Sequence, residues 1–122
     1  MSGIYFDKGS LDALIEHHIG VINRYGFERN EVFSVVVLEC KDLLLGSISG
    51  AFKKILRESD AIINDGEYYF LILPSTNKDG ALTLVNSILE YLGVVIRFKV
   101  LSYPTDGFNG TELIERVKKF RG

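Results

Sequence analysis

The central segment of the sequence reads Ala61-Ile62-Ile63-Asn64-Asp65-Gly66-Glu67-Tyr68-Tyr69-Phe70-Leu71-Ile72-Leu73-Pro74. Its two ends are rich in apolar, β-branched and aromatic residues, which favour strands. Asp65-Gly66 lies between them, and this pair tolerates the positive φ angles of a tight turn. The segment therefore predicts a β-hairpin around Asp65-Gly66.

Two further strands are predicted, one on each side of the hairpin in the sequence. Val32 to Cys40 is a nearly unbroken β-branched run, typical of a strand buried on both faces, and it is the best candidate for a central strand. Val94 to Tyr103 supplies the fourth strand, and the segment Pro104 to Gly107 follows it as a turn.

Apolar residues at helical spacing predict four helices around these strands. Ser10 and Thr111 are the expected N-caps of the first and last helix, and the helices are expected over residues 10–26, about 47–60, 81–93 and from 111 onward. The predicted order is α-β-α-β-β-α-β-α. This order favours an α/β (α+β) fold, a ferredoxin-like palm with a four- to five-stranded mixed or antiparallel sheet flanked by helices.

Composition limits the classes of function that remain. The 122 residues, 47% of them hydrophobic, predict a single domain over residues 1–122. The formal net charge of -2 argues against binding to long nucleic acid. We expect no membrane insertion because Glu39, Lys41 and Asp42 interrupt the longest apolar stretch. The first residues lack the zones of a signal peptide, and the one cysteine, Cys40, excludes an internal disulfide, so we expect a cytoplasmic protein.

Several short segments, in order, resemble the GGDEF family of bacterial diguanylate cyclases. Leu56-Arg57-Glu58-Ser59-Asp60 is similar to the segment that leads into the family's signature hairpin, and Phe70 to Pro74 is similar to the strand after it. Ser102 to Gly107 is similar to the late strand and turn. The resemblance covers roughly Glu31 to the C-terminus and implies the palm fold of enzymes that make cyclic di-GMP.

The signature itself is degenerate. The positions that would spell Gly-Gly-Asp-Glu-Phe are Gly66-Glu67-Tyr68-Tyr69-Phe70, of which the first and last match. In the family, the glycines approach nucleotide phosphates and the acidic residue helps to hold metal ions, whereas Glu67 adds a negative charge and Tyr68 is a poor ligand for a hard cation. Glu39 stands where the family's first strand carries a metal-binding aspartate. One carboxylate is not a two-metal site, so we expect no metal site, no cofactor and no enzymatic activity.

The helical part between Cys40 and Leu56 is shorter than the family's, and Leu43-Leu44-Leu45-Gly46 replaces its polar pattern. The substrate pocket is therefore expected to be missing. The leucine run is interpreted as core or a dimer contact rather than a lipid anchor. The resemblance thus implies a catalytically inactive regulatory module that signals through a protein partner or a homodimer.

An alternative function is a cyclic di-GMP receptor. Arg57-x-x-Asp60 resembles the inhibitory product site of the family, and an arginine with a nearby carboxylate can recognise guanine. The structural interpretation is that Arg57 complements a helix dipole and Asp60 caps the following turn. A second cation for such a site would come from Lys53, Lys54, Arg97 or Lys99.

The remaining chemically notable residues are given structural interpretations. Tyr68 and Tyr69 are expected to be one packed and one exposed. Side chains of His17 and His18 should diverge by about 100° on a helix, which excludes a same-face metal pair. Cys40 is expected to be a buried, inert thiol.

Overall fold

The computed structural model describes residues 3–26, 32–40, 45–107 and 109–121. The elements in chain order are β1 (Ile4–Phe6), the 3₁₀ helix η1 (Lys8–Ser10), α1 (Leu11–Val21), the π-helical turn η2 (Ile22–Gly26), β2 (Phe33–Glu39), α2 (Leu45–Ile55), β3 (Ala61–Asp65), β4 (Tyr68–Pro74), α3 (Lys78–Leu92), β5 (Phe98–Tyr103) and α4 (Gly110–Arg121). Leu43 and Leu44 of the leucine run lie outside the described residues.

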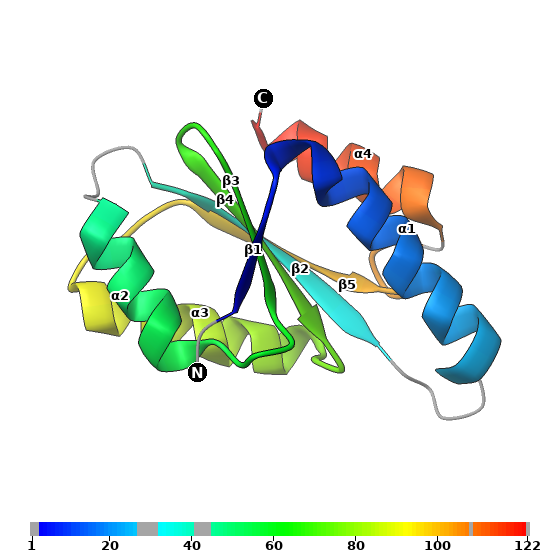
Figure 1. The fold of residues 1–122 in the computed structure, drawn as a ribbon, viewed down its shortest axis with the longest axis horizontal. Coiled ribbons are helices and arrows are strands. Elements are labelled where there is room, and N and C mark those ends of the chain that lie inside the picture. The colour runs from blue at the N-terminus through cyan, green and yellow to red at the C-terminus, as the bar shows by residue number, and fades with distance from the viewer. Residues whose placement is uncertain (1–2, 27–31, 41–44, 108, 122) are drawn as a thin grey trace.

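The strands form one mixed five-stranded sheet in the order β1-β3-β4-β2-β5. β1 runs parallel to β3, whereas the other neighbouring pairs are antiparallel. Figure 1 shows α2 and α3 on one side of the sheet and α1 and α4 on the other. The predicted fold class and hairpin are confirmed, and β2 is an interior strand as expected, paired with β4 on one side and β5 on the other.

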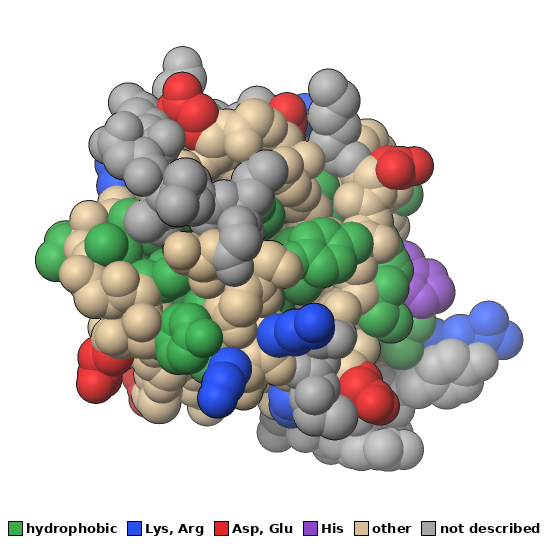
Figure 2. Space-filling model, turned by 60° about the vertical axis from the view of Figure 1, so that its left-hand side comes forward, with side chains coloured by type: hydrophobic (Ala, Val, Ile, Leu, Met, Phe, Trp, Pro, Cys, Tyr) green, Lys and Arg blue, Asp and Glu red, His purple; other side chains and the backbone are tan. Residues whose placement is uncertain are grey.

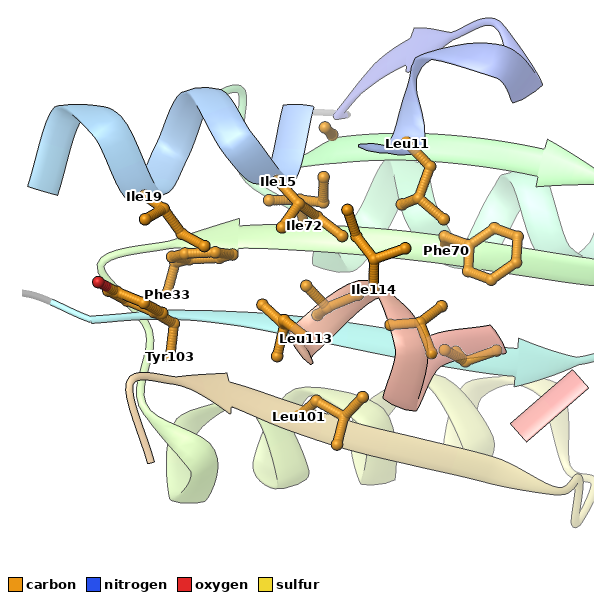
Figure 3. Packing of buried hydrophobic residues seen from close by; sticks show 14 of the residues in the cluster. Leu11, Ile15, Ile19, Phe33, Phe70, Ile72, Leu101, Tyr103, Leu113 and Ile114 are labelled. Atoms are coloured by element: carbon orange, nitrogen blue, oxygen red, sulfur yellow. The ribbon is translucent and has the colours of Figure 1, made fainter. Parts of the chain in front are cut away.

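Helices on both sides explain why β2 is buried from Phe33 to Leu38. Val35 and Val37 point into the core beneath α1 and α4, part of which is drawn in Figure 3, while Val36 and Leu38 point into the core beneath α2 and α3. A strand covered on both faces needs apolar residues at every position. This requirement explains the nearly unbroken apolar run of β2 in the sequence.

Strand β1 was not predicted. It has only three residues, and the side chains of Ile4 and Tyr5 are about half exposed, at 55% and 54%. A strand this short and this exposed has no periodic pattern that would separate it from a loop. Its backbone pairing with Ala61 to Ile63 of β3 forms it instead.

Several predicted boundaries are wrong by a few residues because local hydrogen bonds set them. α2 ends at Ile55 rather than near Asp60, and β5 begins at Phe98 rather than Val94. α4 begins after Asn109, whose side-chain oxygen accepts from the Glu112 backbone N–H at 2.9 Å, so Asn109 and not Thr111 caps this helix. Ser10 makes no side-chain capping bond, because η1 leads directly into α1.

The hairpin turn is displaced by one residue from the predicted pair. Asp65 still pairs with Tyr68, so Gly66 and Glu67 are the two central residues of the turn. Gly66 has a φ of +61°, which a glycine adopts without strain. The side-chain amide of Asn64 donates to the carbonyls of Gly66 and Tyr68, both at 3.1 Å, and holds the turn closed.

Among the described helices, none has the length and apolar character to cross a membrane. On the face shown in Figure 2, hydrophobic side chains occur in separate patches between polar atoms, and lysine and arginine side chains gather toward the lower half. Among the residues that the structure describes, this view shows no continuous apolar surface.

Candidate functional site

Glu39 is the last residue of β2, at the end of the sheet where the β3–β4 turn lies. The strand register places it opposite Tyr68, the first residue of β4. The Tyr68 hydroxyl donates to Glu39 Oε2 at 3.2 Å, and Arg97 Nη1 donates to Glu39 Oε1 at 3.4 Å. Both carboxylate oxygens therefore have a donor from the chain itself, and the Glu39 side chain is only 13% exposed.

Arg97 is itself held in place by α4. Its Nη2 donates to the Phe120 carbonyl at 2.9 Å, and its guanidinium lies 3.9 Å from the centre of the Phe120 ring. This cation–π contact and the ion pair to Glu39 fix the guanidinium between β2 and α4. No local sequence pattern predicts this contact, because the two residues are 23 positions apart.

The residues at this end of the sheet do not fit the metal site that the fold family uses. The described residues contain no group of three or more His, Cys, Asp or Glu side chains that could hold a metal ion. Tyr68 and Arg97 occupy the two oxygens of Glu39, and a guanidinium within bonding distance opposes a divalent cation. Lys41 and Asp42 lie outside the described residues.

The fold separates the five positions that the sequence comparison matched to the GGDEF signature. Gly66 and Glu67 are exposed in the turn, and Tyr68 is half-buried. Tyr69 and Phe70 are buried on opposite faces of β4: the Tyr69 ring packs 5.3 Å from that of Phe52 on α2, and Phe70 belongs to the core beneath α1 and α4. One tyrosine is packed as predicted, whereas the other is half-buried rather than exposed.

Arg57 and Asp60 lie at the opposite end of the sheet, between α2 and β3. Asp60 is fully buried, and its Oδ2 accepts from the Arg57 backbone N–H at 2.8 Å. Arg57 Nη2 donates to the Pro74 carbonyl at 2.7 Å and to Thr76 Oγ1 at 2.9 Å, and it lies 3.4 Å from Asp60 Oδ1. The carboxylate therefore closes the turn, and the guanidinium joins it to the end of β4.

The same end contains a buried polar link that the sequence did not reveal. Ser34 Oγ donates to the Thr76 carbonyl at 2.7 Å and lies 2.8 Å from Ser102 Oγ across the β2–β5 pair. The Ser102 backbone N–H donates to Asp106 at 2.9 Å. Short polar side chains in buried strands need such partners, so the loop after β4 is tied to both β2 and β5.

The four predicted second cations are divided between the two ends of the molecule. Lys53 and Lys54 are exposed on the last turn of α2, close in sequence to Arg57. Arg97 and Lys99 belong to the end of the sheet that carries Glu39. Lys99 lines a cavity of about 460 Å³ together with Arg116, Lys119 and Phe120.

His17 and His18 line another cavity, of about 300 Å³, whose wall includes Phe33, Pro74 and Ser75. Their rings lie edge to face with centroids 5.9 Å apart, closer than the predicted divergence suggests. His18 Nδ1 donates to the Leu14 carbonyl at 2.9 Å, and the ring lies 5.4 Å from that of Phe33. His18 is therefore held by its own helix and by an aromatic neighbour.

Cys40 is buried with a free thiol, as predicted. Burial, with a smaller contribution from the negative charge of Glu39, raises the pKa of the Cys40 thiol to about 11. The thiolate, which is the nucleophilic form, is therefore suppressed at neutral pH.

Solved structures with this arrangement of helices and strands come from the GGDEF family. A DGC protein from Thermotoga maritima superposes with a TM-score of 0.72 and 18% sequence identity, covering 95% of this chain and 94% of that one. The GGDEF domain of YfiN (TpbB) from Pseudomonas aeruginosa superposes with a TM-score of 0.75 and 14% identity, covering 93% of this chain and 86% of that one. This chain has the GGDEF-domain fold.

The similarity of this chain to GGDEF domains was found by comparing structures. No protein-family profile matches the sequence, and no curated protein matches it. Within the GGDEF-like fold, the end of the sheet that carries Glu39 and the signature turn is the candidate site, and its carboxylate is bonded to a phenol and a guanidinium.

Proposed function

We propose that this chain is a non-catalytic, GGDEF-like regulatory module that signals through contact with a protein partner or a second copy of itself. The observation that carries the proposal is the Glu39 carboxylate, which accepts hydrogen bonds from Tyr68 and Arg97. Attack of a 3′-hydroxyl on an α-phosphate assisted by two metal ions needs several oxygen ligands at this place. The described residues contain no group of three or more His, Cys, Asp or Glu side chains that could hold a metal ion, and the chain itself supplies a donor to each oxygen of Glu39.

A non-catalytic module of this kind acts through its fold, because a sheet with helices on both faces can present a surface to a partner. The first test is GTP turnover. The purified chain, incubated with GTP and Mg²⁺ or Mn²⁺, should release neither pyrophosphate nor cyclic di-GMP above a protein-free control. Turnover that is lost in a Glu39→Gln variant would refute the proposal.

The second test is association without nucleotide. Sedimentation velocity and cross-linking in the producing cells should reveal a homodimer or a defined complex. A chain that sediments as a monomer at all concentrations and co-purifies with no protein would contradict the proposal.

The second candidate function is a cyclic di-GMP receptor, and one observation favours it. The Arg57 side chain is 52% exposed, and its side-chain hydrogen bonds to the described residues all use Nη2. Its Nε and Nη1 groups make no hydrogen bond to the described residues, so they can donate to a guanine edge. Asp60 is less suited to a ligand, because its carboxylate is fully buried and closes the turn.

A further inference from the structure

Strand β5 forms one edge of the sheet and pairs only with β2 among the described strands. The backbone N–H of Glu39 donates to the Arg97 carbonyl at 2.9 Å, so Glu39 and Arg97 form a hydrogen-bonded pair. Such pairs alternate along an antiparallel ladder. The register then directs the backbone N–H and C=O groups of Phe98, Val100 and Ser102 away from β2, toward the outer edge.

The outward groups of Ser102 are already used within the chain. Its N–H donates to the Asp106 carboxylate at 2.9 Å, and its carbonyl accepts from the Asp106 N–H at 2.7 Å. No described residue forms a hydrogen bond with the outward groups of Phe98 and Val100. The edge is therefore capped at its C-terminal end and open over its first residues.

A basic cavity lies beside this open edge. Lys99 of β5 and Arg116 and Lys119 of α4 line it together with Phe120, and its volume is about 460 Å³. Neither Lys99 nor Lys119 has an ion pair within the described part of the chain. Arg116 is partly compensated, because its charge helps to hold the pKa of Asp106 down.

We propose that the open edge of β5 and the basic cavity beside it bind an extended acidic segment of a partner protein. This inference rests on the proposed function, and it specifies that the partner contributes an extended segment rich in carboxylates. The segment adds a strand to β5 through the backbone groups of Phe98 and Val100. Side chains on alternate residues of the added strand then face α4, where carboxylates meet Lys99 and Lys119. Val95, which is 95% exposed just before β5, offers an apolar contact at the entrance.

Charge and shape favour this occupant over the others. A second copy of the same edge would bring like charges together, and lysine on an edge strand opposes such self-pairing. Small-molecule sites are mostly apolar and enclosed, whereas cations form most of this wall. Three cations on a chain with a net charge of -2 are too few for long nucleic acid.

The test uses a short fluorescein-labelled peptide in which glutamate and valine alternate, and the full chain as titrant. Binding is followed by fluorescence anisotropy at low salt. A double variant, Lys99→Glu with Lys119→Glu, should weaken binding roughly tenfold or more, since each exposed charge contact is worth a small factor and reversal adds repulsion. Lys53→Glu with Lys54→Glu on α2 is the matched control and should bind as the wild type does. Arg116 is left unchanged because its charge also acts on Asp106.

Two peptide controls separate strand addition from charge attraction alone. A peptide in which lysine replaces glutamate should not bind. Peptides N-methylated at all glutamates or at all valines should differ, because only one of the two sets of N–H groups faces β5. Circular dichroism and melting temperature establish that each variant is folded.

Four outcomes would overturn the proposal: no binding at about millimolar peptide, equal loss in the α2 control, equal binding of both methylated peptides, or displacement of the peptide by inorganic phosphate at low concentration. The anisotropy does not depend on GTP turnover. A chain that makes cyclic di-GMP therefore refutes the proposed function separately, and a chain that fails to bind the peptide leaves that function standing with another surface.

Discussion

The Tyr68 hydroxyl donates a hydrogen bond to the Glu39 carboxylate across the β2–β4 pair, at 3.2 Å. The two residues are opposite each other in the register, so the contact follows from the sheet itself. Arg97 reaches the second oxygen of the same carboxylate. Both oxygens of the Glu39 carboxylate therefore accept hydrogen bonds from side chains of the same chain. In a palm that uses metal ions, such a carboxylate would be available to a cation.

Removing the Tyr68 hydroxyl should destabilise the fold. Tyr68→Phe is expected to lower the free energy of unfolding by about 1–2 kcal/mol, because the bond involves a charged acceptor. Urea denaturation measures the change, and Tyr91→Phe, at an exposed tyrosine, is the matched control. In the Glu39→Gln background the effect of Tyr68→Phe should shrink, and an undiminished effect would show that the hydroxyl acts elsewhere.

The link between Arg57 and the end of β4 predicts a structural role for the Arg57-x-x-Asp60 pair. Asp60→Asn should cost about 1–2 kcal/mol, because a buried carboxylate that closes a turn is replaced by a neutral group. Arg57→Ala should cost about 1 kcal/mol through its contacts with Pro74 and Thr76, and Lys54→Ala should cost little.

The same variants distinguish the two candidate functions. Under the proposed function, cyclic di-GMP leaves the melting temperature of the wild type and of Arg57→Ala unchanged. A rise in melting temperature for the wild type that disappears in Arg57→Ala would instead establish the receptor function.

Alkaline pH should weaken the fold through Cys40. The pKa of this thiol is about 11 in the folded chain, against about 8.5 in an unfolded one. Because the folded state holds the proton more tightly, the free energy of unfolding is unaffected below about pH 8.5 and falls as the pH rises toward 11. Burial also raises the pKa of Tyr69, which adds to the fall.

Urea midpoints between about pH 7 and 10.5 measure this dependence, and a Cys40→Ala variant should show a smaller slope. At neutral pH, a thiol reagent should modify Cys40 slowly without urea and rapidly with it. Rapid modification of the native chain would contradict the buried, protonated thiol.

Acid should weaken the fold through Asp106. Burial alone would raise the pKa of this carboxyl, but the Ser102 backbone N–H and the Lys78 ammonium lower it below its ordinary value, with help from the charge of Arg116. Its stabilising contribution is therefore present above about pH 4 and is lost as the pH falls through the lowered pKa. Asp106→Asn should reduce stability at about pH 7 and flatten the acid limb of the unfolding curve, and an unchanged acid limb would contradict this role of Asp106.

Much of the fold was predictable because periodicity reports burial directly. The run from Phe33 to Leu38 has no polar interruption except Ser34, and a strand covered by helices on both faces requires such a run. β1 was missed because three half-exposed residues carry no period, and pairing with β3 alone creates the strand.

The residue identities at the candidate site could be predicted from the sequence, but the contacts of Glu39 could not. From the sequence we could predict the departure from the GGDEF signature, because the identities of Glu67 and Tyr68 can be read locally without knowledge of the fold. The partners of Glu39 depend on the tertiary fold, because the strand register brings Tyr68 to Glu39 and the packing of α4 against β5 brings Phe120 to Arg97. Such contacts join residues far apart in the chain, and their energies depend on distances of a few ångströms that no local pattern encodes.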